Sequence, residues 1–138
     1  MRERIIKALK ENCDQATGFV LSILEENQCQ SQEIKMQVEL AVEEIFVNIA
    51  SYAYPSQNGD VTVTADVSGA EKKTLTVVFR DSGIPFDPLA KEDPDITLPT
   101  VQRSIGGLGL FLVKNVMDDV TYRYADGYNI LTIRKTFS

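Results

Sequence analysis

Histidine is absent from this 138-residue sequence, and cysteine occurs only twice. Without histidine the chain has no imidazole base, no phosphohistidine and no histidine-rich metal site. Cys13 and Cys29 stand in or beside the first expected helix, too far apart along its axis to form a disulfide. Two cysteines without histidine also argue against a zinc site.

Positive charge is also scarce, because 14 lysines and arginines face 20 aspartates and glutamates, for a formal net charge of −6. This balance argues against non-specific binding to nucleic acid or to an acidic membrane, so we expect neither as a direct partner. The sequence shows no signal peptide and no apolar stretch of membrane length. We therefore expect a cytoplasmic protein with reduced thiols.

What the sequence does contain is an ordinary globular composition, with 43% apolar and 25% charged residues. The length fits one domain, and we expect residues 1–138 to form it. This length also permits a hydrophobic core that needs no disulfide or metal to hold it together.

The chain is organised around a long segment, 32–54, whose apolar residues recur at helical spacing. Ser31 stands just before it and can cap its N-terminus. The expected inward stripe contains Ile34, Val38, Ala41, Ile45 and Tyr52. On a helical wheel Glu44 and Asn48 lie beside this stripe, whereas Glu43 lies on the reverse side. Two polar groups on a core-facing surface are unfavourable unless something satisfies them.

The remaining elements alternate between short helices and hairpin-connected strands. In chain order we expect a short strand within 1–9, a helix from Asn12 or Asp14 to about 28, the long helix, strands 61–67 and 74–80, an irregular segment 87–105, a helix over 110–117, strand 120–125, a turn at Asp126–Gly127 and strand 129–137. Segregation of helices from strands predicts an α+β fold: a two-layer α/β sandwich with a mostly antiparallel, mixed sheet and helices on one face.

The first chemical motif is Glu44 followed one helical turn later by Asn48. An asparagine amide oxygen is a neutral ligand suited to Mg²⁺, which uses few protein ligands alongside phosphates and water. A glutamate one turn earlier can act as a general base. The alternative is a helix-packing asparagine with a glutamate at the edge of the core.

The second motif is Asp81-Ser82-Gly83-Ile84-Pro85-Phe86, directly after an expected strand. A carboxylate at a strand end can accept a hydrogen bond from an exocyclic amine such as adenine N6. Gly83 permits a tight turn and a close backbone approach to a flat ring. The alternative is an ordinary Asp-Ser-Gly turn ended by proline.

The third motif is Gly106-Gly107-Leu108-Gly109, ahead of an apolar helix. Glycines at this place let backbone amides contact phosphates at the positive end of a helix. The spacing matches neither a Walker loop nor a Rossmann fingerprint. The alternative is a flexible glycine turn.

Taken together, the three motifs resemble those of the GHKL ATP-binding superfamily, which includes gyrase, Hsp90, histidine kinases and MutL. Within it the chain resembles the anti-sigma-factor serine/threonine kinases of the RsbW and SpoIIAB type, over nearly its whole length. Residues 44–54 are similar to the N box of that family, 81–87 to its G1 box, and 106–114 with 117–120 to its G2 box and the following helix.

The resemblance implies a Bergerat-type fold that binds ATP and Mg²⁺. It implies that Asn48 is the Mg²⁺ ligand, Glu44 the catalytic base and Asp81 the adenine anchor. Nucleotide contacts are further expected at Gly83, Phe86, Gly106, Gly107, Leu108 and Gly109. Residues 87–105 would form an ATP lid. Tyr52 stands where relatives commonly carry histidine, one turn past Asn48, which bears on the catalytic rate rather than on ATP binding.

Some further residues allow two interpretations. Arg103, at the end of the expected lid, could reach a phosphate or could be an exposed charge. Thr132, on the last strand, could reach the adenine pocket through water or could be an ordinary strand-face threonine. Tyr122, Tyr124 and Tyr128 are expected to pack across strands.

The resemblance predicts a protein kinase that phosphorylates a serine or threonine on a STAS-domain anti-sigma-factor antagonist. Such a kinase alternately holds a sigma factor and is expected to be a homodimer. The alternatives are a non-catalytic ATP-binding switch and an ATPase domain related to two-component histidine kinases. The lack of histidine argues against the latter. A gyrase- or MutL-like ATPase would need a transducer domain, for which we expect no room in these residues.

Overall fold

A computed structural model describes residues 1–55, 58–90 and 105–138. Its sheet contains β1 (Arg2–Lys7), β2 (Asp60–Ser68), β3 (Lys73–Asp81), β4 (Asp119–Ala125) and β5 (Tyr128–Phe137). Within the described residues these strands form one sheet in the order β1-β2-β3-β5-β4, and each of its four pairings is antiparallel. The expectation of a mostly antiparallel sheet is confirmed, and its described part contains no parallel pair.

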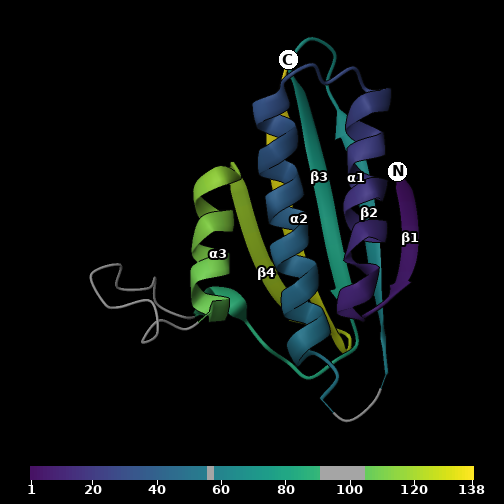
Figure 1. Cartoon of the computed structure of the whole chain (residues 1–138), viewed down its shortest axis with the longest axis vertical. Coiled ribbons are helices and arrows are strands. Elements are labelled where there is room, and N and C mark those ends of the chain that lie inside the picture. The colour runs from purple at the N-terminus through teal and green to yellow at the C-terminus, as the bar shows by residue number, and fades with distance from the viewer. Residues whose placement is uncertain (56–57, 91–104) are drawn as a thin grey trace.

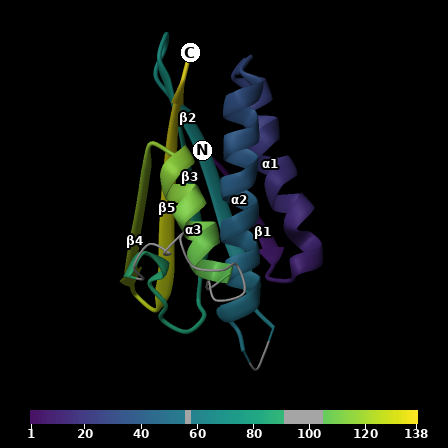
Figure 2. The same ribbon diagram turned by 60° about the vertical axis from the view of Figure 1, so that its left-hand side comes forward.

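In the part of the chain that the structure describes, three helices cover one face of this sheet (Figures 1 and 2). They are α1 (Cys13–Glu26), α2 (Gln32–Tyr52) and α3 (Ile105–Val116), with α2 packed between the other two. Short 3-10 turns occupy Lys10–Asn12 and Pro88–Ala90. The predicted two-layer α+β sandwich is therefore confirmed. Among the described helices, none combines the length and the apolarity that crossing a bilayer requires.

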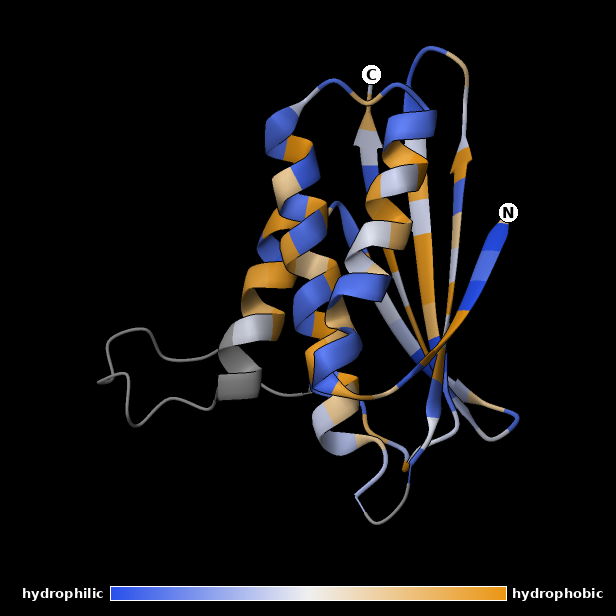
Figure 3. Ribbon diagram, turned by 45° about the vertical axis from the view of Figure 1, so that its right-hand side comes forward, coloured by the Kyte–Doolittle hydropathy of each residue, from blue (hydrophilic) through white to orange (hydrophobic). Residues whose placement is uncertain are grey.

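The core lies between the helices and the sheet, where strand residues alternate between the two faces (Figure 3). Val61, Val63 and Ala65 of β2 are buried, as are Leu75, Val77 and Phe79 of β3. From α2 the largest buried side chains are Ile45 and Phe46. Each such side chain contributes about 1.5–3 kcal/mol when it leaves water, so this layer dominates the folding energy.

On the other face of the sheet the described residues place no helix, and β-branched polar residues line much of it. Thr62 and Thr64 of β2, Thr76 of β3 and Thr132 of β5 alternate with the buried positions and are only partly exposed. On the same face the Arg80 guanidinium lies 4.7 Å from the ring centre of Tyr128, a cation–π contact. We call this surface the open face.

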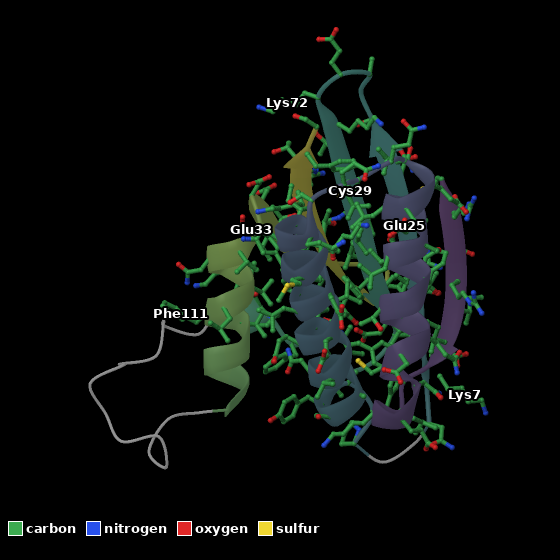
Figure 4. All side chains as sticks on the ribbon, turned by 45° about the horizontal axis from the view of Figure 1, so that its top comes forward. Lys7, Glu25, Cys29, Glu33, Lys72 and Phe111 are labelled. Carbon is green, nitrogen blue, oxygen red and sulfur yellow. The ribbon has the colours of Figure 1, made fainter. Side chains whose placement is uncertain are left out.

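The N-terminus of α2 agrees with the sequence, because the Ser31 hydroxyl accepts a hydrogen bond from the Ile34 amide at 3.2 Å. At α1 the N-cap position is Asn12, but its side chain makes no capping hydrogen bond. Cys13 and Cys29 both have free thiols, and Cys29, labelled in Figure 4, is buried.

Two expectations about helices are wrong. The helix expected over 110–117 begins five residues earlier, at Ile105, so Gly106, Gly107 and Gly109 lie inside α3 rather than before it. Packing of its apolar side against α2 outweighs the cost of glycine in a helix. Tyr52, assigned to the buried stripe of α2, is 47% exposed because it lies in the last turn, where the helix passes the edge of the core.

Candidate functional site

A pocket opens between the C-terminal half of α2 and the adjoining ends of β3, β4 and β5. About 390 Å³ of space lies between its protein atoms, including solvent at its mouth. The wall residues are Ile45, Asn48, Ile49, Tyr52 and Ala53 from α2 and its end, Phe79 and Asp81 from β3, Ile84, Phe86 and Pro88 from the following loop, and Tyr122, Asn129 and Leu131 from β4 and β5. An apolar wall with few polar groups is typical of a small-molecule site.

Asp81 provides the acidic group of this pocket, and only 5% of its surface is exposed. Its Oδ1 accepts hydrogen bonds from the Gly83 amide and from Asn129 Nδ2, both at 2.9 Å. Within the described residues, Oδ2 has no hydrogen-bond partner. Burial raises the pKa of the Asp81 carboxyl, and the two hydrogen bonds partly oppose that rise. A ligand that donates a hydrogen bond to Oδ2 would fit this arrangement.

The loop after Asp81 is held close to the end of α2. Gly83 lies so near Ala53 that a Cβ at position 83 would overlap the Ala53 backbone. The Ile84 amide donates to the Ala53 carbonyl at 3.0 Å. Tyr54 fixes the same loop, because its hydroxyl accepts from the Ser82 amide at 2.9 Å and donates to the Asp60 carbonyl at 2.7 Å. Only glycine fits at position 83 without moving this contact.

Asn129 connects Asp81, the loop that follows it and strand β4. This residue was not identified from the sequence. It is 6% exposed, and its Nδ2 donates to Asp81 Oδ1 and to the Ile84 carbonyl, both at 2.9 Å. Its Oδ1 accepts from the Phe86 amide at 3.1 Å and from the Tyr122 hydroxyl. Asn129 lies opposite Asp81 in the β3–β5 register, which only the assembled sheet reveals.

Aromatic rings form the outer wall of the pocket. Tyr52 stacks on Phe86 with ring centres 6.0 Å apart and planes inclined by 27°. Tyr122 was expected only to pack across strands, but it also lines the pocket and donates to Asn129. Phe86 thus lies in the pocket wall, and its expected nucleotide contact stays a prediction.

Asn48 and Glu44 mark the opposite end of the site. Asn48 lines the pocket, and within the described residues its side chain makes no hydrogen bond. Glu44 lies one helical turn earlier and contacts α3, since a Cβ at Gly109 would overlap its carboxylate. Burial, and secondarily the charge of Glu43, raise the pKa of the Glu44 carboxyl. Glu43 itself is exposed, as the helical wheel predicted.

The donor set is compatible with ATP and Mg²⁺ in the following sense. Asp81 Oδ2 offers an acceptor beside an apolar slot, which matches a flat base with an exocyclic amine. Asn48 offers an uncommitted amide oxygen further along the same pocket. The described residues contain no cluster of three acidic or thiol side chains, so a cation there would need oxygen ligands from phosphate and water as well.

Several predicted site residues lie elsewhere or outside the described residues. Thr132 is paired with Val78 on the open face, so the structure does not bring its side chain to the pocket. The cause is strand alternation, because neighbouring Leu131 faces the pocket. Arg103 and most of the expected lid, 91–104, fall outside the described residues. At Gly106, Gly107 and Leu108 the structure describes only the helical backbone.

A family model described as the histidine kinase-like ATPase domain matches residues 6–135. The chain belongs to this family. The match includes all pocket-lining residues, so Asp81 and Asn48 lie within the shared domain, as does Glu44. This membership agrees with the resemblance that the three sequence motifs predicted.

Among curated proteins, the chain is 31% identical over 98 residues to the serine-protein kinase RsbW of Bacillus cereus strain B4264, covering 68% of this chain and 59% of that relative. It is 27% identical over 131 residues to the serine-protein kinase RsbW of B. cereus strain AH187, covering 92% and 73%. A B. anthracis serine-protein kinase RsbW is 30% identical over 98 residues. The matched part thus spans about three fifths of the length of the first relative.

Proposed function

We propose that this protein is an ATP-dependent serine/threonine protein kinase that acts as an anti-sigma factor. Its substrate is a STAS-domain antagonist, in a partner-switching pathway in which the kinase also binds a sigma factor. The observation that carries the proposal is the arrangement of one pocket with Asp81 at one end and Asn48, one turn from Glu44, toward the other. Similarity to proteins named serine-protein kinases supports it.

In this proposal each end of the pocket has its own role. Asp81 Oδ2 accepts a hydrogen bond from the adenine N6 amine, while the apolar wall contacts the two faces of the ring. Asn48 provides an oxygen ligand to Mg²⁺. The metal, when bound, neutralises charge on the phosphates during transfer. Glu44 accepts the proton of the incoming serine or threonine hydroxyl. Its raised pKa brings a carboxylate closer to the range of an effective base.

Phosphotransfer is the decisive experiment. The protein is incubated with radiolabelled ATP, Mg²⁺ and a candidate STAS-domain protein, and labelled substrate is followed on a gel. Transfer of label to a serine or threonine of that protein supports the kinase. The proposed homodimer and sigma-factor binding are tested separately, by light scattering with and without nucleotide and by co-purification with the sigma factor.

A second candidate is a non-catalytic module in which ATP binding only switches partner affinity. It is favoured by Tyr52, which stands where relatives commonly carry histidine and is 47% exposed beside the pocket. ATP-dependent partner binding without transfer of label would select this candidate. A third candidate, an ATPase domain of the two-component type, requires a histidine acceptor on another chain, because this sequence has none.

A further inference from the structure

The Asn129 side chain uses all of its hydrogen-bonding capacity within the protein. Its two N–H groups are directed at Asp81 Oδ1 and the Ile84 carbonyl, and its oxygen accepts from the Phe86 amide and the Tyr122 hydroxyl. An asparagine side chain has two donors and two acceptor sites, so none of them remains for a ligand.

The orientation of this amide follows from its partners. A backbone N–H such as that of Phe86 can only donate, so the oxygen of Asn129 must face it. A backbone carbonyl such as that of Ile84 can only accept, so the amide nitrogen must face that side. The opposite orientation would place the amide oxygen against two acceptors, Asp81 Oδ1 and the Ile84 carbonyl, and the amide nitrogen against the Phe86 N–H. Hence Asn129 presents an N–H to Asp81, and Tyr122 acts as donor to Asn129.

This orientation determines which oxygen of Asp81 faces the pocket. Oδ1 accepts from two donors, Asn129 Nδ2 and the Gly83 amide, and these fix the plane of the carboxylate. Oδ2 is the acceptor that remains, within the described residues. The same asparagine ties Ile84 and Phe86 to β5, so it fixes the loop that forms one wall of the pocket.

We propose that Asn129, held by Tyr122, is a positioning residue that aims Asp81 Oδ2 at the exocyclic amine of the bound base. It thereby sets the preference for a 6-aminopurine without a hydrogen bond of its own to the nucleotide. The inference rests on the proposed function, since it concerns the base-binding end of the same pocket. Burial supports it, because Asn129 is 6% exposed and Asp81 is 5% exposed, so solvent has little access to replace a lost hydrogen-bond partner.

The test measures the preference for ATP, expressed as the ratio of the dissociation constant of the nucleotide without the amine to that of ATP. For each variant, calorimetry gives the dissociation constants of ATP and of purine riboside triphosphate, which lacks the 6-amino group. If Asn129 were merely structural, its substitution would weaken the binding of both nucleotides alike and leave the ratio unchanged. If Asn129 is a positioning residue, its substitution lowers the ratio, because only ATP has the amine that donates a hydrogen bond to Asp81 Oδ2.

The main variant is Asn129→Asp, which keeps the size of the side chain but replaces both donors by acceptors. We expect the preference for ATP to fall about tenfold, the range of a charge-assisted hydrogen bond. Tyr122→Phe removes only the hydroxyl that orients Asn129, and we expect a smaller loss of about two- to fourfold. If Asn129→Asp does not fold, as judged by circular dichroism, Tyr122→Phe carries the test.

Tyr124→Phe is the matched control. Tyr124 faces Asn129 across the β4–β5 pair but is 46% exposed, and within the described residues it makes no hydrogen bond to Asn129. Its substitution should leave the ratio unchanged. In an Asp81→Asn background, Asn129→Asp should lower the ratio no further, since the two residues act through one hydrogen bond.

The outcomes separate this inference from the proposed function. If the wild-type protein binds neither nucleotide, the proposed function fails and the inference fails with it. If the wild type prefers ATP but folded Asn129→Asp and Tyr122→Phe retain the same preference, only the inference is overturned. A lowered ratio in both variants, with Tyr124→Phe unchanged, establishes the positioning role.

Discussion

The two ends of the pocket differ in how completely the protein satisfies its own polar groups. At the Asp81 end, Asn129, Tyr122 and the loop amides form a closed network with both carboxamide atoms fully used. At the Asn48 end, the described residues provide no hydrogen bond to Asn48 and only a close approach of Glu44 to Gly109. One end is organised before any ligand binds, whereas the other leaves its oxygens uncommitted.

This difference indicates which end of the pocket selects the nucleotide base and which end takes part in the chemical step. A preorganised acceptor beside an apolar slot discriminates between bases, because an incorrect base leaves a buried group unpaired. An uncommitted oxygen suits a metal that arrives with its nucleotide and some of its water. We therefore expect substitutions at the first end to change which nucleotide binds, and those at the second to change what happens to it.

The largest effect should follow from Glu44→Gln, which keeps shape but removes the base. We expect phosphotransfer to the STAS-domain protein to fall roughly 10²- to 10⁴-fold while ATP affinity changes little. Rates come from single-turnover transfer of label. Glu43→Gln is the control, since Glu43 is exposed and acts on Glu44 only through its charge, as the smaller of two causes that raise the Glu44 pKa. A wild-type rate for Glu44→Gln would place the base elsewhere.

Asp81→Asn should produce the next largest effect, at the opposite end. A hydrogen bond to a charged group is worth about 1.5–3 kcal/mol, so ATP affinity should fall roughly 10- to 150-fold. Competition calorimetry with GTP sharpens the test, because guanine has no 6-amino group. Equal competition by GTP and ATP in the wild type would contradict the adenine-anchor role.

Asn48→Ala should weaken binding only when Mg²⁺ is present. Loss of a metal ligand beside a triphosphate should exceed the ~1 kcal/mol of a neutral hydrogen bond, which corresponds to a decrease of about fivefold or more. Calorimetry in Mg²⁺ and in EDTA provides the internal control. Equal ATP affinity of variant and wild type in Mg²⁺ would remove Asn48 as a ligand.

Gly109→Ala should separate stability from activity. Alanine in a helix is favoured over glycine by about 0.8–1 kcal/mol, so thermal stability should rise slightly. The new methyl group would displace the flexible carboxylate of Glu44, so transfer should slow. Gly18→Ala in α1 is the matched control, because a Cβ there meets no atom within 4 Å. It should gain stability with unchanged transfer.

The smallest effect concerns pH and stability without nucleotide. Burial raises the pKa of Asp81, so its contribution to stability is present below its unfolded pKa, near 3.8, and is lost as pH rises through the folded value. Urea unfolding measures the free energy of unfolding of Asp81→Asn minus that of wild type. This difference should be more favourable to the variant at pH 7 than at pH 3. Asp118→Asn should show the opposite trend, because hydrogen bonds from Thr136 lower the pKa of Asp118.

Local patterns were sufficient for most of the fold. The Ser31 cap, the alternation of Val61, Val63 and Ala65, and the Asp126–Gly127 turn each depend on neighbouring residues, and the structure agrees with all of them. The backbone at Asp126 and Gly127 has positive φ values of 55° and 84°, as a tight hairpin turn requires. The start of α3 was predicted less well, because contacts with α2 outweigh its glycines.

The site was predictable only where its residues belong to a sequence motif. Asp81, Gly83 and Phe86 stand close together in one short stretch of the chain; Asp81 and Phe86 line the pocket, and the Gly83 amide donates to Asp81. Asn129 is distant in sequence and reaches Asp81 only through the register of two strands that no hairpin connects. The two interpretations of Thr132 could not be separated from sequence for the same reason, since the face of β5 that meets the pocket depends on that register.

The open face shows how an uncovered sheet can remain compatible with water. A strand favours β-branched side chains, yet a layer of valine exposed to solvent would make neighbouring molecules adhere. Threonine has the branched shape of valine and a hydroxyl that water can bind. Thr62, Thr64, Thr76 and Thr132 therefore let the second side of the sheet keep its strand-forming residues without becoming a site of aggregation.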